Sequence, residues 1–136
     1  MFDTKETERL KIWKDLRDSI EVSADPIQEV AVFWSRAPFV SKYLDPYNPN
    51  SWPDPWKLIL DNKFCDLAIA LGMCYTISLT KRFKDNEFEI HMAMSEKENR
   101  YVLVVNKDTV LNWYPRTPVS LKDIPVELIK IWSCGK

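Results

Sequence analysis

Two side chains in this sequence have the chemistry of a nucleophile and a base: Cys65 and the single histidine, His91. Cys65 is the second residue of the stretch 64–79, in which the only charged residue is Asp66. A helix drawn there is apolar on nearly all faces, so we expect a central core helix surrounded by protein. Asn62 would be its N-cap and would place the thiol at N3, where unpaired backbone N–H groups favour a thiolate. The alternative is a buried cysteine that only fills space.

His91 belongs to a stretch in which apolar residues alternate with other types. The apolar members are Phe88, Ile90, Met92 and Met94, and the residues between them are Glu89, His91, Ala93 and Ser95. This period of two predicts a half-buried β-strand. If the apolar row covers the core helix, His91 points to the opposite face of the strand and away from Cys65.

An amphipathic helix is predicted near the N-terminus, after a capping box at residues 3–6. Its apolar stripe recurs at steps of three and four residues and consists of Leu10, Trp13, Leu16 and Ile20. A narrow stripe of this kind packs either against its own domain or against a partner protein. Both interpretations stay open, and the first is favoured.

The other predicted elements complete one α+β domain over residues 1–136. Asp25 and Pro26 begin a second helix that stops before Pro38. Residues 45–55 hold four prolines without a period, so they form an irregular loop that carries Tyr47 and Trp52. Asp54 starts a short helix before the core helix. A charged turn at 96–100 follows the strand of His91, and strands at 101–105 and 109–114 then complete an antiparallel meander. Residues 126–132 are either a helix or a strand.

Composition and charge exclude several classes of protein. The 19 basic and 20 acidic residues give a net charge of −1 without a long run of either sign, which disfavours nucleic acid and anionic membranes as partners. The polar N-terminus does not have the pattern of a secretory signal, so we expect an intracellular protein when it is made. We expect reduced thiols from the three cysteines. With one histidine and no Cys-x-x-Cys pair, we expect no metal and no cofactor.

Residues 52–113 resemble the bacterial transglutaminase-like cysteine proteinases, which have a papain-like core. The resemblance lies in Trp-Pro-Asp-Pro at 52–55, Cys-Asp at 65–66, Ala-Ile-Ala at 68–70 and the strand pattern at 101–113. It implies acyl transfer in which Cys65 attacks an amide or ester carbonyl and His91 carries the proton. Where the family has a third catalytic residue, this sequence offers Asn106 or, as the weaker candidate, Asn112.

The whole chain is also similar to small proteins of T4-like tailed bacteriophages of marine bacteria, above all over residues 52–83 with the lead-in at 45–47. This resemblance implies a virion or assembly protein of the neck, tail or baseplate, made in the host cytoplasm and acting through other protein subunits. Two functions are therefore compared: a cysteine acyl-transfer enzyme, and a scaffold that binds a protein partner. Because Trp and Tyr are enriched at interface hot spots, Tyr47 and Trp52 are the first candidates for the binding surface, and the stripe of the N-terminal helix is the second.

Overall fold

The computed structural model describes residues 2–38, 44–94, 100–113, 117–125 and 127–134. Within these residues, four helices come first: α1 (Glu6–Val22), α2 (Pro26–Trp34), α3 (Pro55–Asp61) and α4 (Asp66–Ser78). Five strands of the described part follow: β1 (Phe88–Met94), β2 (Arg100–Asn106), β3 (Thr109–Trp113), β4 (Thr117–Ser120) and β5 (Ile129–Cys134). Single turns of 3₁₀-helix lie at Pro49–Ser51 and Leu121–Asp123. The predicted α+β class is confirmed.

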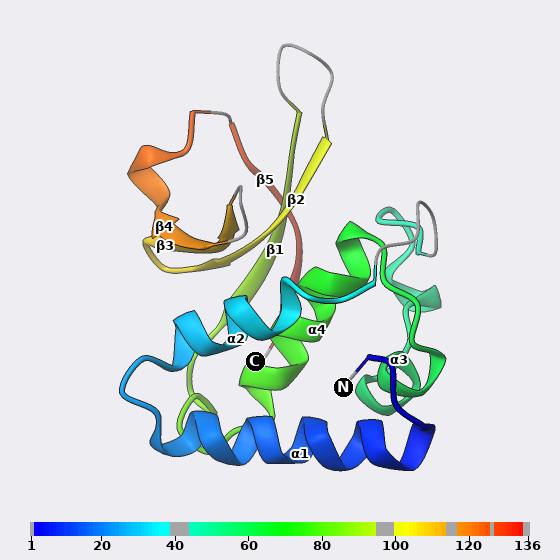
Figure 1. Cartoon of the computed structure of the whole chain (residues 1–136). Coiled ribbons are helices and arrows are strands. Elements are labelled where there is room, and N and C mark those ends of the chain that lie inside the picture. Colours follow the sequence, from blue (N-terminus) through cyan, green and yellow to red (C-terminus); the bar gives the residue numbers. More distant parts are fainter. Residues whose placement is uncertain (1, 39–43, 95–99, 114–116, 126, 135–136) are drawn as a thin grey trace.

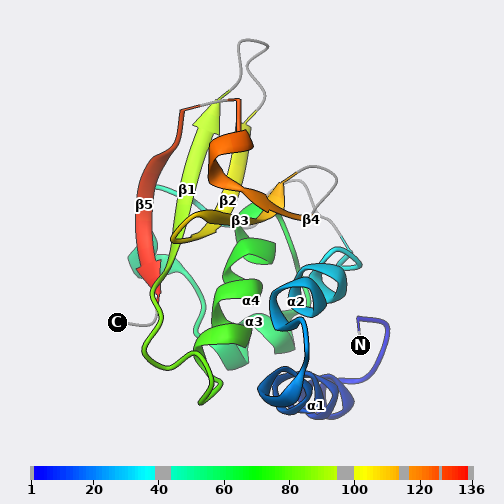
Figure 2. The same ribbon diagram turned by 90° about the vertical axis from the view of Figure 1, so that its left-hand side faces the viewer.

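The strands form one antiparallel sheet in the order β4-β3-β2-β1-β5. The expected meander is therefore present in β1, β2 and β3, although most of the charged turn expected at 96–100 lies outside the described residues. Of the two structures predicted for the C-terminal segment, the strand is the one observed, as β5. It pairs with β1 and forms the opposite edge of the sheet from β4. Figures 1 and 2 show α4 at the centre, below this sheet, with α2 beside it and α1 on the side away from the sheet.

Helix α4 is the buried centre of the domain, as its composition predicts. Every residue from Leu67 to Ile77 is buried, because the sheet covers one side of the helix and α1, α2 and α3 cover the others. An unbroken apolar run is stable in a helix only when protein surrounds it on all sides. No helix among the described residues is long and apolar enough to cross a membrane.

The start of α4 differs from the prediction. Its N-cap is Cys65 itself, so the thiol lies one turn earlier than the expected N3 position. Asn62 instead ends α3 as its C-cap, with φ 53° and ψ 38° in the left-handed region. Asparagine suits both roles, since its side chain can cap an N-terminus and its backbone tolerates a left-handed conformation. Asn62 Nδ2 also donates to the carbonyl oxygen of Phe2 at 2.8 Å, which ties the N-terminal segment to this turn.

Helix α1 packs on its own domain. Trp13, Leu16 and Ile20 are buried in the main core, and Leu10 is half-buried against it. The apolar stripe of α1 therefore packs against its own domain, which is the favoured of the two interpretations. The predicted capping box is wrong, because the N-cap of α1 is Lys5, whose side chain makes no capping hydrogen bond.

The buried Arg9 of α1 connects this helix to α3. Its guanidinium donates to the carbonyl oxygens of Ile59 at 3.1 Å and Leu60 at 2.9 Å, and also to that of Thr4. The last carbonyls of a helix have no partners inside the helix, and a basic side chain can satisfy them. Arg9 therefore fixes the C-terminal end of α3 against α1.

Candidate functional site

Cys65 lies at the N-terminal end of the central helix, where the resemblance to transglutaminase-like proteinases implies a nucleophile. Only 6% of the residue is exposed, and its side chain makes no capping hydrogen bond to the first turn. Its carbonyl oxygen accepts the N–H of Ile69 at 3.0 Å, the first hydrogen bond of α4. The thiol therefore adjoins the positive end of the helix dipole while being packed in the main hydrophobic core.

His91 lies on the other face of the sheet. In the β1–β2 register His91 is opposite Leu103 and Glu89 is opposite Val105, and these two β2 residues belong to the second hydrophobic cluster. The apolar row of β1, by contrast, packs in the same core as α4 and Cys65. Because neighbouring strand residues point to opposite faces, the predicted parity of β1 is confirmed. The structure therefore does not bring His91 to Cys65.

The partner of His91 is a carboxylate instead of a thiol. Its Nε2 lies 2.9 Å from Glu89 Oε1, and Lys130 Nζ of β5 lies 3.3 Å from Glu89 Oε2. The hydrogen bond from His91 holds the pKa of the Glu89 carboxyl below its usual range, with burial opposing the shift and Lys130 adding to it. His91 Nδ1 is buried and has no hydrogen-bond partner among the described residues. His91, Glu89 and Lys130 thus form a polar network between β1 and β5. His91 and Glu89 lie on the opposite face of the sheet from α4.

Among the described sheet residues that pack in the same core as α4, none is a general base. These side chains are apolar and buried: Phe88, Ile90, Met92, Val102, Val104 and Leu111. A nucleophilic thiol needs a base within hydrogen-bond reach, about 2.6–3.2 Å and often longer without substrate. The described strand residues on the Cys65 side of the sheet therefore have nothing that can take its proton.

Neither asparagine orients His91. Asn106 follows the parity of Val102 and Val104, so it lies on the opposite face of β2 from the residue that pairs with His91, and its Nδ2 donates to the carbonyl oxygen of Glu87 at 3.0 Å. Asn112 joins β3 to β2: its Oδ1 accepts Val104 N–H at 2.9 Å and its Nδ2 donates to Val102 O at 3.0 Å. Both amides satisfy backbone groups, so the expected role of Asn106 in catalysis has no geometric basis here.

The two aromatic residues of the proline-rich loop differ in exposure. Tyr47 is 76% exposed. Trp52 is half-buried; its Nε1 donates to Asp45 O at 2.7 Å, and its ring packs edge-on against Trp132 at 5.4 Å. Asp45 Oδ1 also accepts the N–H of Tyr47 at 2.9 Å, so the loop is held at its base. Tyr47 is thus presented outward on an ordered support.

Trp56 is an exposed aromatic residue that the patterns in the sequence did not indicate. Trp56, in the first turn of α3, is 48% exposed and packs edge-on against Trp13 at 5.4 Å. Arg17 lies over both rings, 4.5 Å from the centroid of Trp13 and 5.4 Å from that of Trp56. Partial burial lowers the pKa of Arg17. Because these three side chains come from α1 and α3, only the packing of the two helices reveals that they lie together.

No metal centre is evident in the part of the chain that the structure describes. There, no three His, Cys, Asp or Glu side chains gather closely enough to hold an ion. Cys65 and Cys74 are both buried thiols, and the side chain of Cys134 lies outside the described residues.

Comparisons with known proteins identify the fold. No protein-family model and no curated protein matches the sequence. Among solved structures, calcium-bound LapG of Legionella pneumophila aligns over 96% of this chain and 76% of its own, with a TM-score of 0.72 and 13% sequence identity. The fold is transglutaminase-like.

The likeness to LapG confirms one of the two resemblances seen in the sequence, at the level of fold. At 13% identity it does not carry over an activity, so the roles of individual residues in this chain rest on their own geometry. The similarity to bacteriophage proteins stays a prediction.

Proposed function

We propose that this chain is a protein-binding scaffold that keeps the transglutaminase-like fold without its acyl-transfer chemistry. The observation that carries this proposal is the position of the only histidine in the sequence, which faces away from Cys65 and is bound to Glu89. Acyl transfer through a thiol requires an adjacent base, and the described side chains of β1 and β2 that pack in the core of Cys65 are apolar. A fold without its catalytic residues retains a rigid surface that can bind a partner.

The loop at residues 45–55 is the proposed binding surface. Tyr47 is the most exposed aromatic side chain in the described part of the chain. Hydrogen bonds from Tyr47 N–H and Trp52 Nε1 to Asp45 hold the loop, and its four prolines restrict the unbound state. A loop that is already ordered loses less conformational entropy on binding, which favours affinity. Tyr47 is therefore the proposed anchor of the interface.

The proposed partner is another protein subunit of a bacteriophage particle. This part of the proposal is supported by the sequence resemblance to proteins of T4-like phages, with the neck, tail or baseplate as the site of assembly. The protein would be made in the host cytoplasm and then become part of the virion. The balanced charge of 19 basic and 20 acidic residues favours protein over nucleic acid or membrane as the partner.

Replacing Tyr47 by alanine is expected to weaken partner binding while leaving the free protein as stable as before. Loss of an anchoring aromatic residue costs about 1 kcal/mol or more, or roughly a five-fold or greater loss of affinity. Tagged wild-type and Tyr47→Ala proteins would be compared by quantitative pull-down, and each free protein by a thermal melt. Val22→Ala is the matched control, since Val22 is also highly exposed, at 84%, but lies at the end of α1.

Equal recovery of the same partner by Tyr47→Ala and wild type would place the binding surface elsewhere. A melting temperature lowered by many degrees would show that the Tyr47 side chain contributes to the fold itself. Either result contradicts the proposed role of this loop.

The second candidate function is acyl transfer by Cys65, which the N-terminal position of the thiol on α4 and the transglutaminase-like fold favour. On the binding proposal, Cys65 and Cys74 should react slowly and similarly with iodoacetamide at pH 6, because both are buried. His91→Gln should leave these rates unchanged. Fast labelling of Cys65 alone that is lost in His91→Gln would overturn the binding proposal in favour of an enzyme. Mass spectrometry of peptides from the labelled protein measures each rate.

A further inference from the structure

A solvent-open pocket of about 360 Å³ lies between the N-terminal segment and the end of α2. The described residues that line it are Phe2, Asp3, Phe33, Arg36 and Pro38. It belongs neither to the Cys65 region nor to the loop of Tyr47. Its size is at the lower end of the 300–1,000 Å³ range of ligand pockets, and is enough for one large side chain.

The apolar walls of the pocket are held in place by the core. The ring of Phe2 packs against Phe33, Trp34 and Phe64, with centroid separations of 5.5, 5.6 and 5.3 Å. The carbonyl oxygen of Phe2 accepts the hydrogen bond from Asn62 that ties the N-terminal segment to the end of α3. Aromatic rings fixed in this way offer a preformed surface to another apolar or aromatic side chain.

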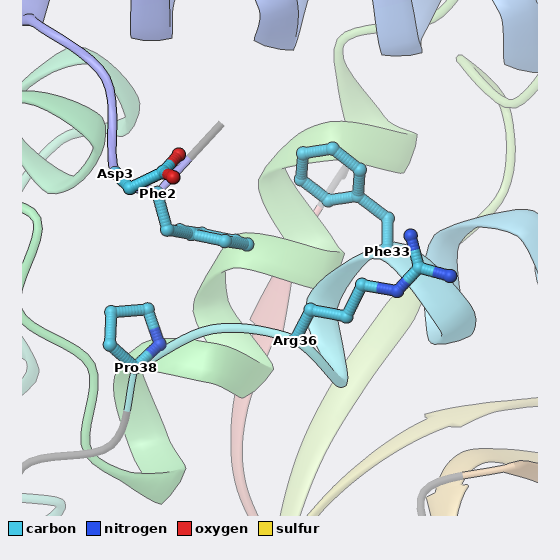
Figure 3. A pocket seen from close by; sticks show the side chains of 5 residues that line it. All are labelled: Phe2, Asp3, Phe33, Arg36 and Pro38. Atoms are coloured by element: carbon cyan, nitrogen blue, oxygen red, sulfur yellow. The ribbon is translucent and has the colours of Figure 1, made fainter.

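Two side chains of opposite charge flank these walls. Figure 3 shows the carboxylate of Asp3 next to Phe2 and the guanidinium of Arg36 next to Phe33, on opposite sides of the hollow. Both residues are exposed, and neither side chain has a hydrogen bond or an ion pair with any described residue. The pocket therefore combines an apolar floor with an available anion at one end and an available cation at the other.

We propose that this pocket binds a peptide segment of a protein partner, in which an aromatic or large aliphatic side chain lies between a basic residue and an acidic residue. The apolar side chain packs on the floor that Phe2 and Phe33 form, the basic residue pairs with Asp3 and the acidic residue pairs with Arg36. Opposite charges at the rim give specificity and orientation more than affinity. A free apolar molecule would use the floor alone and leave both charges unpaired.

Nuclear magnetic resonance titration with three capped peptides tests this assignment. The peptides are Lys-Ser-Phe-Ser-Glu and its two like-charged relatives, Lys-Ser-Phe-Ser-Lys and Glu-Ser-Phe-Ser-Glu. The mixed peptide should bind about two- to five-fold more tightly than either relative, the range expected for one exposed ion pair. Shifts of the Phe2 and Phe33 signals should saturate together, and the preference should fall at high salt.

Charge-reversed proteins make the test reciprocal. Arg36→Glu should prefer the peptide with two lysines, and Asp3→Lys should prefer the peptide with two glutamates. Because both residues are exposed, these variants should melt like the wild type. Tyr47→Ala should bind all three peptides as the wild type does, so the result is independent of the function proposed for the loop.

Equal affinities for the three peptides in all three proteins would overturn the charge assignment. Shifts confined to residues remote from Phe2 and Phe33 would overturn the site. N-acetylphenylalanine amide binding as tightly as the mixed peptide would overturn the peptide assignment and identify the pocket as a site for a small aromatic molecule.

Discussion

Alanine in place of Gly72 is expected to destabilise the protein by about 2 kcal/mol. A Cβ atom on this residue of α4 would lie 2.4, 2.5 and 2.7 Å from Cη2, Cζ3 and Cζ2 of Trp34, all too short for a carbon contact. Overpacking a core costs about 1–3 kcal/mol and occasionally more, and the better helix propensity of alanine returns about 1 kcal/mol. We expect the overpacking cost at Gly72 to lie at the upper end of its range, because Trp34 cannot move away easily.

Contacts on several sides of Trp34 keep its ring next to Gly72. The residue is completely buried, its Nε1 donates to Thr76 Oγ1 at 3.0 Å, and its ring packs edge-on against Phe64 at 5.4 Å. Glycine is therefore required here by the close approach of another side chain and not by an unusual backbone conformation. Chemical denaturation followed by circular dichroism would measure the loss.

A smaller residue at position 34 should reduce the penalty at Gly72. In a double-mutant cycle, Gly72→Ala should cost less in a Trp34→Phe background than in the wild type, with a coupling of about 1 kcal/mol, since residues in contact are not additive. Equal costs in the two backgrounds, or a higher melting temperature for Gly72→Ala alone, would show that the Trp34 ring can shift without loss.

Thr76→Val is expected to cost about 2–6 kcal/mol, because one hydroxyl of α4 serves two buried tryptophans. Thr76 Oγ1 accepts hydrogen bonds from Trp13 Nε1 at 2.8 Å and Trp34 Nε1 at 3.0 Å, and it donates to Gly72 O at 2.6 Å. Valine has nearly the same shape but leaves both indole N–H groups buried without an acceptor. Each unsatisfied donor costs about 1–3 kcal/mol.

Thr76→Ser separates the hydrogen bonds from the packing. Serine keeps the hydroxyl and removes one methyl group, so it should cost only about 1 kcal/mol. The same denaturation experiment would compare the two variants. Similar losses for serine and valine would mean that the hydroxyl contributes no more than the methyl group to the contact between α1, α2 and α4, which would contradict its role as a shared acceptor.

The short-range patterns of the sequence determined most of the secondary structure and the face to which His91 belongs. The apolar run from Leu67 to Ile77 has no polar face, so a helix there had to be central. The alternation in β1 has a period of two, so His91 and the apolar row had to point to opposite faces once the row packed on α4. The resemblance to transglutaminase-like proteinases predicted the fold but not the catalytic geometry.

Only the tertiary structure decided how distant parts of the chain meet, because local sequence does not contain that information. Asn62 suits either end of a helix, and the packing of α3 against α1 and α4 made it a C-cap, which moved Cys65 to the start of α4. Residues 126–132 were ambiguous until pairing with β1 made β5 a strand. The indole N–H groups of Trp13 and Trp34 share Thr76 across 63 and 42 residues of chain, since burial forces them to find the nearest acceptor in space.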